Sequence, residues 1–150
     1  MAQSLSSIYV HLTFSTSGRR LYLDEHVRNI VFPYIVGIMK HKHAPVLEIG
    51  GADEHLHILF RLPKDIALMH LIRIVKQESS KHIKQVMPGS RLFAWQTGYC
   101  ALSVSPSGVE SVRRYIRNQE RHHRTRSYRD EVLRMLRDSG TDYDERYLWD

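Results

Sequence analysis

The sequence has little cysteine and no long apolar segment. Its single cysteine, Cys100, excludes a disulfide within the chain and suits a reducing cytoplasm. No apolar run approaches the roughly 20 residues of a membrane helix, and the first residues lack the basic-then-apolar order of a secretion signal. We therefore expect a cytoplasmic protein with no membrane partner.

Internal repeats, low-complexity stretches and Gly/Ser linkers are also missing, which argues against two domains. A chain of 150 residues is long enough for one hydrophobic core. We expect a single domain over 1–150, with a core at about 5–125 and a helical, acidic tail over 126–150. That tail either docks on the body or shields a basic surface. The net charge of +6 is compatible with a polyanionic partner, although charge alone identifies none.

Alternating or β-branched runs predict four strands, at 8–14, 46–49, 54–61 and 99–104. Helical spacing predicts one helix after an Asp24 cap, with Pro33 kinking it or moving its start, and a second after an Asp65 cap. Ser107 and Glu110 have capping-box spacing and open a third helix, which runs to about Arg124. A further helix is expected at 128–137.

This order, strand–helix–strand–strand–helix–strand, predicts an α+β fold. It is the split βαβ arrangement of a ferredoxin-like (RRM-like) antiparallel sheet with helices on one face, here followed by a C-terminal helix. Such a sheet hosts many functions, so the fold decides nothing by itself.

Two histidines interrupt an apolar strand in the segment EHLHILFR. His55 and His57 are two residues apart, so both side chains lie on one face, while Leu56 and Ile58 point into the core. The two imidazoles can converge on one divalent cation if a third ligand joins them. The alternative is a strand whose polar face is exposed to water.

The third predicted helix offers that ligand. Tyr115 and Gln119 are four residues apart and share one flank of the helix. Between 109 and 126 there are six arginines and two acids, a surplus that can bind a phosphate backbone. The alternative is an amphipathic helix with solvated arginines and a half-buried tyrosine.

Together these residues point to phosphoryl transfer. A tyrosine oxygen would attack phosphorus, and arginines would offset the developing charge. A free phenol has a pKa of about 10, so it needs a metal and nearby cations to favour phenolate. Tyr115 meets this requirement better than its nearest rival, Tyr99, which has no polar residue on a following helical turn.

Several segments, in order, resemble the single-strand DNA transposases of the HUH tyrosine class, over nearly the whole chain. This class includes insertion-sequence enzymes and REP-associated tyrosine transposases. The segments are YVHLTFSTSGR, GGADEHLHILF, IVKQESSKHIK, FAWQTGYCALSVSPSGVESVRRYIRNQERHH and YDERYLWD. Glu54 stands where the family usually has aspartate, and Cys100 and Leu102 stand where it usually has glycine and phenylalanine.

The resemblance implies that His55, His57 and Gln119 hold Mg²⁺ or Mn²⁺ and that Tyr115 is the nucleophile. Such enzymes cut single-stranded DNA, keep the 5′ phosphate on the tyrosine and free a 3′ hydroxyl, which later rejoins a strand. The implied partners are single-stranded DNA with hairpin ends and a second copy of the chain. In insertion-sequence enzymes the tyrosine helix reaches the partner's histidine pair, giving active sites in trans.

We expect DNA contacts, and nucleoid association when DNA is bound, from six basic residues: Arg113, Arg114, Arg117, Arg121, Lys76 and Lys81. A solvated surface is the alternative for Lys76 and Lys81. His122 and His123 are expected to cap their helix or contact DNA rather than bind metal. Two other functions stay open: a non-catalytic module that binds single-stranded nucleic acid, and a metal-dependent phosphodiesterase that uses water.

Overall fold

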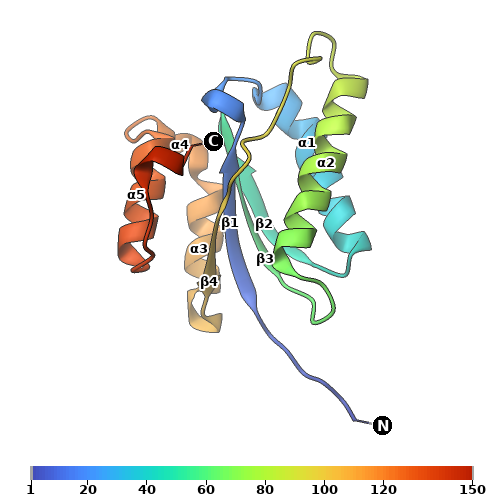
Figure 1. The fold of residues 1–150 in the computed structure, drawn as a ribbon, viewed down its shortest axis with the longest axis vertical. Coiled ribbons are helices and arrows are strands. Elements are labelled where there is room, and N and C mark those ends of the chain that lie inside the picture. Colours follow the sequence, from blue (N-terminus) through green and yellow to red (C-terminus); the bar gives the residue numbers. More distant parts are fainter. Residues whose placement is uncertain (1, 150) are drawn as a thin grey trace.

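The computed structural model describes residues 2–149, so residues 1 and 150 of the predicted domain lie outside the described part. Figure 1 shows a central sheet with helices on both sides. The regular elements are β1 (Tyr9–Ser15), α1 (Glu25–His41), β2 (Val46–Gly51), β3 (His55–Arg61), α2 (Leu68–Val86), β4 (Cys100–Val104), α3 (Val109–Arg117), α4 (Gln119–His123) and α5 (Tyr128–Asp138).

The sheet has the strand order β2-β3-β1-β4, and every neighbouring pair is antiparallel. This is the ferredoxin-like topology that the element order predicts. In the register of β1 with β3, Leu12 lies opposite Ile58 and Thr13 lies opposite His57. Each strand therefore presents apolar residues to one face and polar residues to the other.

Helices α1 and α2 cover the apolar face (Figure 1). The core there consists of strand residues and residues of both helices, including Leu12, Phe14, Leu56, Ile58, Phe60, Val31, Ile35, Leu71 and Val75. Asp24 caps α1 as predicted, because its carboxylate accepts a hydrogen bond from the Val27 amide at 2.9 Å. The helix runs through Pro33 without a change of its start.

Helices α3 and α5 lie on the opposite side of the sheet (Figure 1). His55 and His57 are completely buried there, so the alternative of a strand face exposed to water is wrong. A glycine lets α3 pack closely on β2: a Cβ added to Gly50 would lie 2.5 Å from the carbonyl oxygen of Ile116. The C-terminal helices thus turn the polar strand face into a second interior.

Two predicted caps are wrong. Asp65 does not cap α2, which begins at Leu68 after a turn and has no side-chain cap. Ser107 does not form a capping box with Glu110: Pro106 starts a 3-10 turn that includes Ser107, and the Ser107 hydroxyl instead lies 3.2 Å from that of Ser105. In each case a tight turn occupies the position that the cap required.

The third predicted helix is not continuous to Arg124. Asn118 has φ −100° and ψ 22°, which ends α3, and the short helix α4 follows. Leu148 and Trp149 of the tail pack against the small cluster formed by Cys100, Tyr128, Val132 and Leu136, so the tail docks on the body. No helix within residues 2–149 has the length and apolar character to cross a membrane.

Candidate active site

The two histidines of β3 meet polar groups from the C-terminal helices. His55 Nε2 lies 2.8 Å from Gln119 Oε1, at the start of α4. His57 Nε2 lies 2.7 Å from Glu131 Oε1, from α5. Gln119 and Glu131 are almost completely buried, with 1% and 2% of their surfaces exposed. The predicted meeting of His55, His57 and Gln119 is therefore present in the fold.

Tyr115 joins the same cluster within the same chain. Its hydroxyl donates to the Glu131 carboxylate, and its ring lies edge-on to His57 with 5.8 Å between ring centroids. Gln119 Nε2 donates to Glu131 at 3.1 Å. Tyr115 and Gln119 thus both contact the Glu131 carboxylate, although the helix breaks at Asn118 between them. This agrees with the prediction that the two side chains share one flank.

Glu131 was missed by sequence reasoning. It lies three residues after Tyr128 on the face of α5 that also carries Val132 and Leu136, and that face packs towards β4. An acid on the apolar face of an amphipathic helix is the signal that could have found it. Ser127 fixes the start of this helix, because its side chain accepts a hydrogen bond from the Asp130 amide.

Two residues orient the histidine rings from behind. His55 Nδ1 donates to the carboxylate of Glu54, and His57 Nδ1 lies 2.8 Å from His11 Nε2. Burial lowers the pKa of His11 to about 3, so its ring is neutral near pH 7. These contacts at Nδ1 direct both Nε2 atoms into the cluster, as partners of metal-binding histidines do. Glu54 holds the His55 ring in this way.

The surroundings of Tyr115 keep its hydroxyl protonated. Burial, followed by the negative charge and hydrogen bond of Glu131, raises the pKa of Tyr115 well above its ordinary value, although Gln119 and Arg126 act in the opposite direction. Burial alone would raise the pKa of Glu131, but the nearby imidazoles of His123, His57 and His55, of which His57 is hydrogen-bonded to it, hold it far below its usual value. The phenol therefore donates to a carboxylate anion.

The residues present fit a divalent cation. One ligand atom from each of His55, His57 and Glu131 lies within 4.8 Å of the others. His123 adds a buried Nε2 that has no hydrogen-bond partner within residues 2–149 and lies 3.8 Å from Glu131 Oε1. Two imidazoles with carboxylate and amide oxygens form a donor set that suits Mn²⁺ and, through its oxygens, Mg²⁺.

The sequence profile of the family described as "Transposase IS200 like" matches residues 4–119. This chain belongs to the IS200-like transposase family. The match covers β1 to the first residue of α4, and thus includes His55, His57, Tyr115 and Gln119. Glu131, by contrast, lies beyond it.

Two solved structures share the fold of this transposase. A predicted transposase from Deinococcus radiodurans R1 has a TM-score of 0.65 and 18% identity, over 79% of this chain and 98% of that one. A REP-associated tyrosine transposase bound to a REP hairpin has a TM-score of 0.60 and 16% identity, over 82% and 74% of the two chains. Among curated proteins, none matches the transposase significantly.

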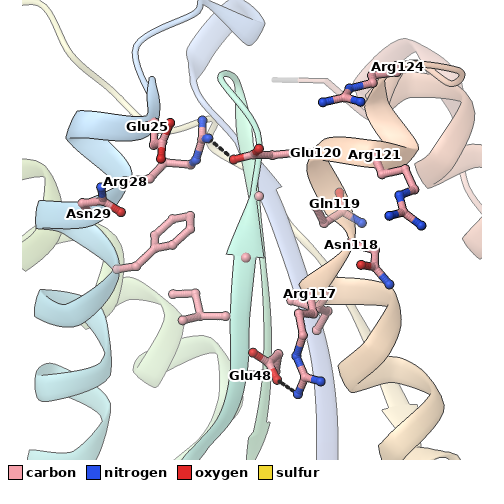
Figure 2. Close-up of a pocket in the computed structure, with 15 residues that line it drawn as sticks. Glu25, Arg28, Asn29, Glu48, Arg117, Asn118, Gln119, Glu120, Arg121 and Arg124 are labelled. Carbon is pink, nitrogen blue, oxygen red and sulfur yellow. Dashed lines mark hydrogen bonds and ion pairs between the residues drawn. The ribbon is translucent and has the colours of Figure 1, made fainter.

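Two clefts reach the cluster from opposite sides of α3 and α4. The first, of about 410 Å³, is lined by Tyr115, Arg126, Glu131 and Arg134 among others. The second, of about 510 Å³, lies between α1 and α3–α4 and reaches Gln119 (Figure 2). Ion pairs of Arg28 with Glu120 and of Arg117 with Glu48 line this second cleft, and Tyr115 is not among the residues that line it. The first cleft is therefore the one that gives access to the tyrosine.

The predicted DNA-binding residues do not form one surface. Arg113 and Arg117 lie on α3 and both approach Glu48, at 3.6 and 2.9 Å. Lys76 and Lys81 lie on α2, across the sheet (Figure 1). Arg114 and Arg121 are exposed on α3 and α4.

Lys76 forms hydrogen bonds within the protein. Its ammonium group donates to the carbonyl oxygens of Gln96, Thr97 and Gly98, at 2.8, 3.1 and 2.7 Å. An ammonium group has three hydrogens, so these bonds can use all of them. DNA contact by Lys76 stays a prediction, and the structure gives this residue a role in holding the loop before β4.

Proposed function

We propose that this transposase nicks and rejoins single-stranded DNA in a metal-dependent reaction, with Tyr115 as the nucleophile. The observation that carries the proposal is the convergence of the Tyr115 hydroxyl with His55, His57 and Gln119 in one buried cluster. A satisfied polar core would not need a tyrosine hydroxyl beside an open cleft. Nor would it leave His123 Nε2 without a hydrogen-bond partner among residues 2–149.

His55, His57 and Gln119 would hold the cation, Mg²⁺ or Mn²⁺. When bound, such a cation polarises a phosphodiester oxygen and offsets the charge that develops on it. The chain's own residues do the rest: Glu54 and His11 orient the two imidazoles, and Glu131 holds the Tyr115 hydroxyl.

In the proposed cleavage step, Tyr115 Oη forms a bond to phosphorus and passes its proton, through the hydrogen-bonded Glu131 carboxylate, to solvent. The bond from phosphorus to the 3′ oxygen breaks, and that oxygen leaves with the electron pair and takes up a proton from solvent. The product is a 5′-phosphotyrosine with a free 3′ hydroxyl. A 3′ hydroxyl later attacks the phosphotyrosine and returns the tyrosine, so neither hydrolysis nor a nucleotide cofactor is needed.

Single-stranded DNA with a hairpin is the proposed substrate, since the solved REP-associated relative was bound to a REP hairpin. Arg126 and Arg134 beside the tyrosine cleft would bind phosphates near the reacting bond. Arg113, Arg114, Arg117, Arg121 and Lys81 remain candidates for contacts farther along the DNA. Because Tyr115 reaches the histidines of its own chain, we favour a reaction in cis; a homodimer with sites in trans stays a prediction from the resemblance.

The test is formation of a covalent adduct. Wild-type protein incubated with single-stranded hairpin DNA and Mn²⁺ should give a protein–DNA band on a denaturing gel, and Tyr115→Phe should lose it by at least about 10³-fold. Tyr99→Phe is the matched control, because Tyr99 is exposed and lines a different cleft beside α2. Its adduct should form at the wild-type rate.

The other functions give other results. Cleavage that persists in Tyr115→Phe without any adduct would favour the phosphodiesterase that uses water. DNA binding with no cleavage in any variant, at any divalent cation, would favour the non-catalytic binding module. Either result would overturn the tyrosine mechanism.

A further inference from the structure

We propose that Glu131 is a fourth protein ligand for the divalent cation and also the residue that positions Tyr115, which makes α5 part of the active site. This inference rests on the proposed metal dependence. It concerns a residue outside the stretch that matches the family, 4–119.

The spacing of the candidate ligands supports it. A six-coordinate cation with bonds of about 2.1 Å has neighbouring ligand atoms about 3.0 Å apart. Glu131 Oε1 lies 2.7 Å from His57 Nε2 and 3.6 Å from His55 Nε2, and Gln119 Oε1 lies 2.8 Å from His55 Nε2. These separations bracket the expected value, so Glu131 Oε1 lies where a ligand atom beside the two histidines would lie, as the amide oxygen of Gln119 does beside His55.

The charge of the cluster gives a second reason. Glu131 is 2% exposed, and within residues 2–149 its only ion-pair partners are the imidazoles of His55, His57 and His123. A buried carboxylate without a permanent positive charge costs several kcal/mol. A bound divalent cation would provide that charge.

The two carboxylate oxygens have separate partners. Oε1 faces the histidine nitrogens, whereas Oε2 accepts the Tyr115 hydroxyl and the Gln119 amide at 3.1 Å. The Gln119 side chain is fixed in turn, with its oxygen towards His55 and its nitrogen towards Glu131. One side chain of α5 therefore connects the cation ligands to the nucleophile.

In the competing explanation, the Glu131 carboxylate occupies the cation site only while no metal is bound, and it moves out of the site when the metal binds. The two cases predict opposite effects of neutralising Glu131. A ligand that is lost weakens metal binding, whereas an occupant that is removed leaves metal binding unchanged or makes it tighter.

The experiment is a calorimetric Mn²⁺ titration of the full chain without DNA, for wild type and for Glu131→Gln. The expected result is an affinity that is about 10- to 100-fold lower in Glu131→Gln. Asp130→Asn is the matched control, since it removes one exposed acid of the same helix and should bind Mn²⁺ like wild type. Circular dichroism of each variant checks that the fold is kept.

A second measurement keeps the test valid if Glu131→Gln is less stable. Mn²⁺ should slow hydrogen exchange of the α5 amides in wild type and in Asp130→Asn, but not in Glu131→Gln, because a ligand on α5 couples metal binding to the docking of that helix. Wild-type Mn²⁺ affinity in Glu131→Gln together with wild-type protection of α5 would overturn the inference.

The variant His57→Ala distinguishes a failure of the inference about Glu131 from a failure of the proposed function. If His57→Ala loses Mn²⁺ binding while Glu131→Gln keeps it, the histidine site stands and only the role of Glu131 is wrong. If His57→Ala binds Mn²⁺ like wild type, or wild type binds none, the metal dependence itself fails and the inference fails with it.

Discussion

The two faces of the sheet are built by the same strands and are both buried, yet they hold opposite kinds of side chain. Leu56 and Ile58 of β3 face α1 and α2, whereas His55 and His57 face α3–α5, and all four are 0% exposed. Burial alone therefore does not separate residues that stabilise this transposase from the residues proposed to bind its metal. The difference lies in partners: the apolar face is satisfied by packing, and the polar face by hydrogen bonds between side chains.

Because the two faces of the sheet differ in this way, we expect opposite outcomes for substitutions at two neighbouring residues of β3. The loss of activity on the polar face is the largest effect that we predict. His57→Ala should lower adduct formation by at least about 100-fold per folded molecule, because it removes one of the proposed cation ligands. Leu56→Ala should instead lower the free energy of unfolding by about 2–5 kcal/mol through a core cavity, with adduct formation by the folded fraction within a few-fold of wild type. Urea unfolding and the denaturing gel measure the two effects.

A similar loss of activity per folded molecule in His57→Ala and Leu56→Ala would contradict this distinction between the two faces. That would mean that the polar cluster depends on close packing of the apolar face. A Leu56→Ala variant with unchanged stability would instead contradict its assignment to the core.

A second prediction concerns the contact between β2 and α3. Gly50→Ala would bring a Cβ within 2.5 Å of the Ile116 carbonyl oxygen, so α3, which carries Tyr115, must shift. We expect a loss of about 1–3 kcal/mol in the free energy of unfolding, and lower adduct formation. Gly37→Ala is the control: a Cβ there meets nothing within 4 Å, and alanine should stabilise the interior of α1 by about 0.5–1 kcal/mol. Wild-type adduct formation in Gly50→Ala would show that the position of α3 is not critical.

The apolar face could be predicted from the sequence almost completely, because alternation in strands and helical spacing depend on neighbouring residues. His55, His57, Tyr115 and Gln119 were also predicted. The two histidines share one strand, whose period of two fixes a common face. Tyr115 and Gln119 are four residues apart and keep a common flank across the break at Asn118. Glu131 was missed because its contact with His57 joins residues 74 positions apart and depends on how α5 docks.

Two helix caps were predicted wrongly from the local sequence. Asp65 and the pair Ser107–Glu110 have capping residues at suitable spacing, but adjacent turns take up the positions that the caps needed. His11 was likewise read only as part of a strand, although its side chain lies on the polar face beside His57. The strand pairing of β1 with β3 determines that contact, and a single strand does not reveal it.

The smallest expected effect concerns Lys76 on the apolar side. Its three carbonyl contacts hold the loop that leads into β4, and its ammonium group lies 4.9 Å from the centroid of the Phe14 ring. Lys76→Met should therefore lower the free energy of unfolding by about 1–3 kcal/mol, with little change in DNA affinity or in its dependence on salt. The exposed residue Lys81 serves as the control: Lys81→Met should leave stability within about 0.5 kcal/mol of wild type. A flatter salt dependence in Lys76→Met with unchanged stability would instead assign Lys76 to DNA binding, and would mean that the apolar side of the sheet also faces the substrate.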